Sequence, residues 1–571
     1  MAAAHFTHFL TRASRTLRPV SGGSRRRMAL GAILPCLKPA DPMFYAEWAE
    51  GRFALAGMSV VLAGRSPFAV EGAPEAWRRS LHGFDWLRHI PPSVDPNAAL
   101  HVEALVAEWL AQAKRRDAVA SVDGVVARRV LSWLAHADVL LQTDAADHYD
   151  DILKALRADI ATLQKTTRGQ PVTAADGAAR LLGLIALVAA GLCIDDEDEL
   201  LRGAEAALGA ALVERQAVVR DPVWRVPQLA ADLLLELETL RRLYRMRGAD
   251  VPVFLTDGVG HLRGLVGALL LGDGSLARLG SARTGADEQL TLWLVARHAD
   301  VQPGRAGSST TAGFARLLAG GTCLIADVGA PLAARHALSV EMSSGRVPLL
   351  VHDGQPGEVD RDSAGTLVFS AGATEDATLA TVTRHVPSLE PAHTVMTEIA
   401  AGAAQHVDAT HAGHSRRGFV HRRRLTLSAC GARLDGVDEL RLLVGAEAPA
   451  SAPFAVRFVL HPTVRVTLGA ANDAVVLTAE NGHCWRLSAP GHTLSVEGAA
   501  YRDGAQTRET VQVLVLADVA ASRTVEWQLV READVGEGAE EMEAEPAAAI
   551  ARPASLAEAL AALVPIAPER P

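Results

Sequence analysis

Four side chains that can exchange protons or bind a metal lie within nine positions in the second half of the chain. They are His406, Asp408, His411 and His414. Histidine and carboxylate suit zinc, but this spacing matches no closed zinc site. A solvated loop or a site that contacts a sugar explains the cluster better, so we expect no metal here. His411 and His414 are candidate proton carriers.

A strongly basic segment follows directly after this cluster. Residues 416–424 contain six arginine or histidine side chains in nine positions. Arginine binds carboxylate and sulfate through two parallel hydrogen bonds, which suits an anionic polysaccharide. Arg416, His421 and Arg423 are therefore candidate substrate-binding residues. The alternative is the exposed face of an ordinary strand, and both interpretations stay open.

The elements that must position these residues change in character along the chain. Apolar residues at helical spacing predict helices in the first half. The expected helices cover residues 101–116, 126–142, 149–164, 174–193, 197–216, 229–247 and 253–271. The connections are short, so consecutive helices should be antiparallel neighbours that bundle, stack or curl into a ring.

From about residue 304 the apolar residues alternate instead. Residues 338–351 predict a hairpin, and the runs 454–460, 511–515 and 525–529 predict further short strands. Such strands, with turn signals about every ten residues, indicate a β-sandwich or barrel. We therefore expect an α+β multidomain protein, with a helical domain over residues 51–300 and an antiparallel β-domain over residues 301–531.

The two ends of the chain differ from the rest. Residues 1–50 form a basic segment, and Ser24–Arg27 followed by apolar Met28–Leu37 is similar to a twin-arginine export signal. A disordered basic start is the alternative, so both periplasm and cytoplasm stay open. Residues 532–571 are acidic and then rich in alanine and proline, which predicts a disordered tail.

Composition excludes several classes of protein. A net charge of −10 over 571 residues argues against bulk nucleic-acid binding. The five cysteines form no CxxC pair, so neither a zinc site nor a disulfide framework is indicated. The longest apolar run, Leu181–Ile194, is too short to span a membrane, and we expect no integral membrane segment.

Several motifs, in the same order along the chain, resemble bacterial heparinase II/III-like proteins. They are Leu81–Leu87, Arg129–Leu134, Val340–Arg346, His411–His414, Gly418–Leu425, Phe458–Pro462 and Asn481–Arg486. The resemblance implies an incomplete α/α toroid followed by an antiparallel β-sandwich. It also implies a polysaccharide lyase, a carbon–oxygen lyase that cleaves next to a uronic acid by β-elimination and needs no cofactor.

The chemistry of β-elimination has three requirements. A cation must neutralise the uronate carboxylate so that the C5 proton becomes acidic. A base must remove that proton, and an acid must protonate the leaving oxygen. Under this resemblance Arg225 is the candidate for the carboxylate, and His411 or His414 is the candidate proton carrier.

The chain also departs from the family pattern. Trp224 stands where the family has a histidine, and Ser363–Leu367 lacks a second one. An exposed Trp224 could stack on a sugar ring, whereas the alternative is core packing between helices. Two functions follow: a lyase acting on a uronic-acid-containing polysaccharide, heparin-like or bacterial, or a catalytically weakened relative that binds anionic glycan without cleaving it.

Overall fold

The structure is a computed structural model that describes most of residues 29–532. The stretches not described inside this range are 91–95, 113–116, 142–145, 170–173, 218–222, 280–308 except Leu292 and Val295, 312, 330–337, 353–366, 370–392, 396–403, 412–413, 415–416, 448 and 504–505. Residues 1–28 of the basic start and residues 533–571 of the acidic tail lie outside the described residues, whereas residues 29–50 are described and pack on the helical half as an ordered segment that includes Phe44–Ala49.

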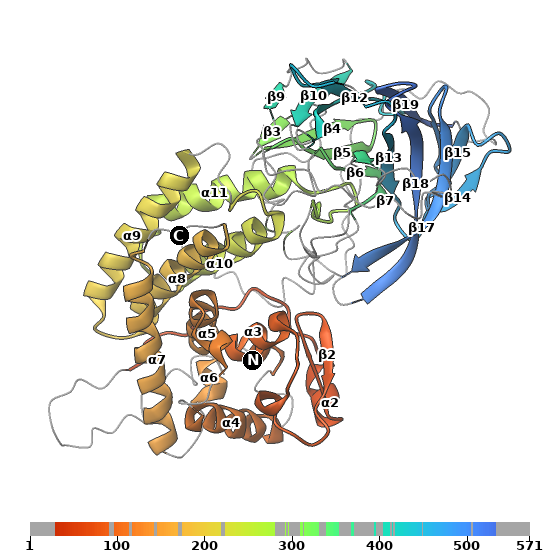
Figure 1. Cartoon of the computed structure of the whole chain (residues 1–571). Coiled ribbons are helices and arrows are strands. Elements are labelled where there is room, and N and C mark those ends of the chain that lie inside the picture. The colour runs from red at the N-terminus through yellow and green to blue at the C-terminus, as the bar shows by residue number, and fades with distance from the viewer. Residues whose placement is uncertain are drawn as a thin grey trace, which may run out of the picture.

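The first half of the chain is helical, as predicted (Figure 1). Its elements are α2 (Phe44–Ala49), β1 (Arg52–Leu55), β2 (Met58–Val61), η1 (Pro67–Ala69), α3 (Glu75–Gly83), η2 (Asp85–His89), α4 (Pro96–Ala111), η3 (Ala118–Ser121), α5 (Asp123–Ala135), α6 (Ala137–Leu140), α7 (Ala146–Thr166), α8 (Ala174–Cys193), α9 (Asp198–Ala217), α10 (Pro227–Met246) and α11 (Val253–Ala268). Six of the seven predicted helices correspond to one helix each, with ends shifted by up to five residues, whereas the predicted helix 126–142 is divided at His136 into α5 and α6.

Helices α5, α8 and α10 form the inner wall of a ring. Helix α8 packs against both α5 and α10, while α7, α9 and α11 pack on the outside. The inner helices begin at the same end, because Gly124 lies against Ala179 and Gly177 lies against Val223. Parallel inner helices alternating with outer helices that return the chain are the arrangement of an α/α toroid.

A strap formed by residues 29–38 enters this ring from the end where the inner helices finish. The amide of Asp195 donates to the carbonyl of Ala29 at 2.9 Å, and the amide of Gly31 donates to the carbonyl of Cys193 at 2.8 Å. Further along, the amide of Leu34 donates to the carbonyl at the end of α5 at 3.1 Å, and its side chain is buried. The strap therefore closes one end of the toroid axis.

Among the described residues, one helix is long and apolar enough to cross a membrane, at Ala175–Cys193. It belongs to α8, and 78% of its most apolar window is buried within the molecule. Its neighbours are α5, α7, α9 and α10. The apolar run 181–194 is thus accounted for by the inner wall of the toroid.

The second half consists of antiparallel strands. They are β3 (Ser309–Thr311), β4 (Phe314–Ala319), β5 (Thr322–Asp327), β6 (Val340–Ser344), β7 (Val347–Leu350), β8 (Leu367–Phe369), β9 (His393–Val395), β10 (Gln405–His411), β11 (Phe419–Leu427), β12 (Arg433–Leu442), β13 (Pro453–Val459), β14 (Arg465–Leu468), β15 (Ala474–Thr478), β16 (Cys484–Ser488), β17 (Thr493–Asp503), β18 (Gln506–Asp518) and β19 (Thr524–Arg531).

These strands make three sheets, with the orders β3-β4-β5-β6-β7, β14-β15-β16-β19-β12-β11-β10-β9 and β17-β18-β13-β8. Buried apolar residues from all three sheets share one core. Polar side chains also join the sheets. The Gln405 side chain of β10 forms hydrogen bonds with the backbone N–H and C=O of Leu318 on β4, and the Trp485 indole of β16 donates to Ser344 Oγ on β6 at 3.0 Å. The predicted toroid followed by an antiparallel β-sandwich is confirmed.

The five cysteines are all free thiols. Cys193 and Cys323 are buried, as small apolar residues would be, whereas Cys36 and Cys430 are exposed. The sequence alone does not separate these two groups, because exposure depends on which segments cover each thiol.

Candidate functional site

Arg225 lies at the junction between the two halves, two residues before α10 begins. It is 5% exposed, and its guanidinium forms an ion pair with the buried carboxylate of Asp327 at the end of β5. The guanidinium also donates to the carbonyl of Gly313 at 3.0 Å and lies 4.4 Å from the centre of the Phe314 ring. Arg225 therefore ties the toroid to the first β-sheet.

The junction is shaped around this side chain. A Cβ atom on Gly329 would lie 2.6 Å from Arg225 Cζ, so only glycine leaves room for the guanidinium there. Burial raises the pKa of the Asp327 carboxyl, and the adjacent guanidinium offsets part of that rise. The pair is thus a buried contact between domains, and Arg225 is not presented to solvent for a substrate carboxylate.

Trp224 is packed in the core, which was the alternative to sugar stacking. It is 2% exposed, and its indole N–H donates to the carbonyl of Arg215 at 3.4 Å. The ring also lies 6.0 Å from the ring of His261, centroid to centroid. Its faces are covered by protein, so the predicted role in stacking on a substrate is not supported.

His421 and Arg423 point into the β-domain and meet at Asp438. Both donate to the same oxygen, with His421 Nε2 and Arg423 Nε at 2.6 and 2.7 Å from Asp438 Oδ1. The Trp527 indole donates to Oδ2 at 2.8 Å. Burial raises the pKa of Asp438, but Arg423 and His421 more than offset it and hold that pKa well below its usual range.

The strand alternation of β11 explains this division of the basic segment. Successive side chains point to opposite faces, so His421 and Arg423 are buried while Arg422 and Arg424 face outward. Arg422 forms an ion pair with Asp408 on the neighbouring strand β10. Of the predicted substrate-binding residues, His421 and Arg423 are therefore internal, and Arg416 lies outside the described residues.

The two candidate proton carriers end up near His421. His414 lies in the turn after β10, is 1% exposed, and has its ring 6.4 Å from that of His421, centroid to centroid. His411 is the last residue of β10 and is paired in register with His421. One continuous strand would have placed His406, Asp408 and His414 on the same face, but β10 ends at His411 and His414 lies in the turn that follows.

Arg423 of the β-domain group and Asp327, the partner of Arg225, both contact the segment that precedes β6. Arg423 donates to the carbonyl of Leu338 at 2.7 Å, and the amide of Asp327 donates to the carbonyl of Ser339 at 2.8 Å. Arg225 and the His414–His421 group thus approach neighbouring residues from two sides. Among the described residues, these groups form a buried, charged seam between the toroid and the β-domain.

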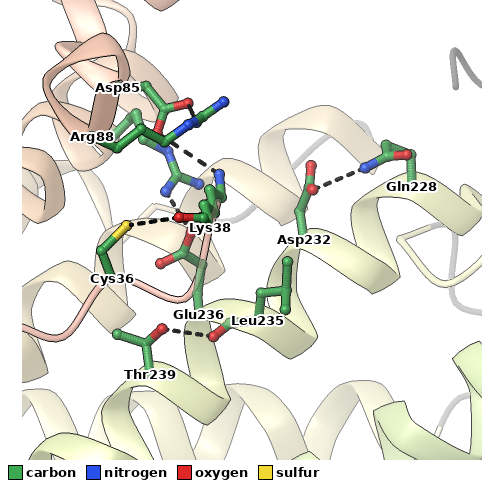
Figure 2. A network of polar contacts seen from close by, with 10 residues as sticks. Cys36, Lys38, Asp85, Arg88, Gln228, Asp232, Leu235, Glu236 and Thr239 are labelled. Carbon is green, nitrogen blue, oxygen red and sulfur yellow. Dashed lines mark hydrogen bonds and ion pairs between the residues drawn. The ribbon is translucent and has the colours of Figure 1, made fainter. Parts of the chain in front are cut away.

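A second polar cluster, which sequence reasoning missed, lies on the toroid axis (Figure 2). We call it the axial cluster, and its charged members are Lys38, Asp85, Arg88, Arg128, Asp232 and Glu236. They come from the strap, η2, α5 and α10. It therefore joins elements that are far apart in the sequence.

The contacts within the axial cluster are of two kinds. Arg88 forms an ion pair with Asp85, and Arg128 forms one with Glu236. Lys38 Nζ lies farther away, 3.8 Å from Asp85 Oδ1 and 3.7 Å from Glu236 Oε1 (Figure 2). A small cavity of about 30 Å³ adjoins these groups.

The pKa values of Asp85 and Asp232 shift in opposite directions, although burial raises both. It raises the pKa of Asp85, but Lys38 and Arg88 more than offset it, so that pKa lies well below its usual range. Asp232 accepts a hydrogen bond from Gln228 at 2.9 Å. Burial nevertheless leaves the pKa of Asp232 raised, because the lowering by the nearby cations is smaller.

A sequence signal for this cluster does exist. Gln228, Asp232 and Glu236 recur every four residues along α10, which places them on one helix face. The helix around them is otherwise mostly apolar and buried. A polar stripe on the buried wall of a helix indicates that the stripe faces other polar groups, but the sequence does not reveal which groups.

Among the described residues, no group of three or more histidine, cysteine or acidic side chains comes together in a way that could hold a metal ion. The clusters at the junction and on the axis contain arginine or lysine beside each carboxylate. They are suited to ion pairing and hydrogen bonding.

The β-domain is similar in sequence to a known protein family. Residues 302–528 match the family model of the heparinase II/III-like C-terminal domain. This segment is similar to the C-terminal domain of heparinase II/III-like proteins. The resemblance inferred from the motifs is therefore confirmed, and it rests on sequence as well as on fold.

Solved structures extend the likeness to both halves. A crystal structure of heparinase III matches with a TM-score of 0.66 and 11% identity, covering 92% of this chain and 88% of that chain. A heparan sulfate lyase from Pedobacter heparinus matches with a TM-score of 0.53 and 11% identity, covering 93% and 88%. The chain thus shares the fold of these two proteins over both halves.

A curated relative is similar over nearly the whole length. FtsZ-localized protein C of Caulobacter vibrioides is 25% identical over 528 residues, which cover 86% of this chain and 89% of that protein. Both the helical and the β half are included in the match.

The junction pair yields a prediction about stability. Replacing Arg225 by methionine leaves Asp327 buried without its partner, which should lower the free energy of unfolding by about 3–5 kcal/mol. Urea unfolding of the two proteins measures the difference. The control is Arg52→Met, which breaks the exposed pair of Arg52 with Glu50 and should cost less than about 1 kcal/mol. Equal effects of the two variants would show that Arg225 is not buried in solution.

His136, which adjoins the axial cavity, predicts a pH dependence. Burial lowers its pKa to about 4, whereas an unfolded histidine titrates near 6.5. As the pH falls from 7 to 4.5, the unfolded state takes up the proton first, so the stability should decrease. His136→Asn should lose part of this decrease, measured by urea unfolding at both pH values. The exposed variant His406→Asn should keep all of it; identical behaviour of the two variants would contradict the assignment.

Proposed function

We propose that this protein uses the lyase fold to bind an acidic, uronic-acid-containing polysaccharide without cleaving it. The observation that carries this proposal is the state of the predicted cationic residues. Arg225 and Arg423 are each buried and each held by a buried aspartate. A guanidinium in such a pair has no free charge with which to neutralise a uronate carboxylate.

The remaining groups support the same conclusion. Elimination needs a base and an acid that reach the sugar, yet His414 and His421 are 1% and 2% exposed. Burial also lowers the pKa of His421, and its Nε2 is hydrogen-bonded to the carboxylate of Asp438. These residues are arranged to stabilise the β-domain, and proton transfer to a bound glycan would require them to be uncovered.

The outward face of β11 is the surface we propose for the glycan. Arg424 is exposed there. Arg422 beside it is partly exposed and faces Asp408 and Glu439, so it differs from the buried pairs only in that solvent, and hence a polymer, can reach it and exchange with these carboxylates. Arginines on one strand face are spaced to meet successive acidic groups along an extended polymer, and they bind carboxylate or sulfate through paired hydrogen bonds.

Incubation with a panel of uronate polysaccharides tests both parts of the proposal. We expect no absorbance from an unsaturated product, and retained binding in affinity electrophoresis. Arg422→Ser combined with Arg424→Ser should weaken binding roughly ten-fold or more, because a hydrogen bond to a charged group contributes about 1.5–3 kcal/mol.

The matched control is Arg465→Ser, an exposed arginine on β14 at the far edge of the same sheet. It should leave binding unchanged. Formation of unsaturated product would instead establish the alternative, a polysaccharide lyase. Binding that survives the double variant would move the glycan to another surface.

A second candidate function is localisation to the cell-division site with FtsZ. It is supported by the likeness to FtsZ-localized protein C, which spans most of both chains. A fluorescent fusion of this protein, expressed in Caulobacter vibrioides, should follow the FtsZ ring. Uniform fluorescence in dividing cells that contain a normal ring would refute this assignment, and the glycan assays would be unaffected by that outcome.

A further inference from the structure

The charges of the axial cluster balance only when Lys38 is counted. Among the described residues that form it there are three carboxylates, on Asp85, Asp232 and Glu236, and two guanidiniums, on Arg88 and Arg128. With all groups ionised they leave one negative charge. The ammonium of Lys38 supplies the missing positive charge.

Lys38 is also the most loosely held member. The two arginines contact their carboxylates directly, whereas Lys38 Nζ stays 3.7 and 3.8 Å from the nearest acidic oxygens. The adjoining cavity of about 30 Å³ is lined by Ser132 and Thr239 together with apolar side chains such as Leu131 and Leu235. A cavity of this size can hold water, and the ammonium of Lys38 is a more compact cation than a guanidinium.

The ammonium reaches the axis on a segment that is separate from the ring. Every other member of the axial cluster lies on η2, α5 or α10, whereas Lys38 ends the strap of residues 29–38. The strap is anchored at the far end by backbone hydrogen bonds to α8 and α5. Losing the Lys38 contacts would leave both arginine–carboxylate pairs in place.

We propose that the toroid axis is a binding site for a primary ammonium group, which Lys38 fills in cis, and that the strap is its displaceable plug. The ligand class is a small alkylammonium, held by Asp85 and Glu236 and excluded while Lys38 is present. This site lies in the helical half and is independent of the glycan surface on β11.

Chemical rescue in the full-length chain tests the site. Lys38→Ala removes the side chain beyond Cβ, which corresponds to n-propylammonium. The variant should melt below the wild type, and n-propylammonium chloride should raise its melting temperature toward the wild-type value. The wild type itself should not respond, because its site is occupied.

Matched probes distinguish an ammonium site from general effects. Sodium chloride, n-propanol and tetramethylammonium chloride, at the same concentration, should leave the melting temperature of Lys38→Ala unchanged. Lys38→Met fills the space with an apolar chain and should not be rescued. A response of Lys38→Ala to all probes alike, or to none, would overturn the proposal.

Hydrogen exchange tests the plug. In Lys38→Ala the peptide amides of residues 29–38 should exchange at least ten-fold faster, while those of α5 and α10 should keep their protection. Unchanged exchange in the strap, or equal loosening of the strap and both helices, would show that Lys38 is a fixed part of the ring.

Two natural sources share this chemistry, an amino sugar and a lysine side chain. Glucosamine and Nα-acetyl-lysine amide can each be tested for stabilising Lys38→Ala, with N-acetylglucosamine and Nα,Nε-diacetyl-lysine amide as uncharged controls. Stabilisation by one amine and not by its acetylated control assigns the source. No stabilisation by either, together with no rescue by n-propylammonium, contradicts the site.

Discussion

The buried ion pair of Arg225 with Asp327 is the charged contact that joins the two halves of the chain. A guanidinium can be buried at a domain junction only when a carboxylate and hydrogen-bond acceptors meet it there. Asp327 and the carbonyl of Gly313 do so from the β-domain. The same pairing that joins the halves also removes Arg225 from solvent.

The same principle recurs in the β-domain and on the toroid axis. Asp438 accepts hydrogen bonds from His421, Arg423 and the Trp527 indole. In the axial cluster, arginines form ion pairs with carboxylates, and these residues come from η2, α5 and α10. Breaking such a pair leaves an uncompensated buried charge. In this protein, the buried charged residues at the junction, in the β-domain and on the toroid axis connect elements that are far apart in the sequence.

The candidate site was only partly predictable from the sequence. Alternation along β11 already separates inward His421 and Arg423 from outward Arg422 and Arg424, because side chains of a strand point to opposite faces. The position of His414 was not predictable, since it depends on where β10 ends. The axial cluster left a visible stripe at Gln228, Asp232 and Glu236, but its partner Lys38 is nearly two hundred positions away.

The sequence by itself determined the order and type of the elements, because apolar periodicity is local and survives in a single chain. It also determined the family resemblance of the β-domain, through motifs that occur in order. Only the tertiary structure decided whether each basic residue is free or paired. That outcome depends on contacts between distant segments, such as Arg225 with Asp327, Arg423 with Asp438 and Lys38 with Glu236, and no local pattern encodes which distant carboxylate a cation will meet.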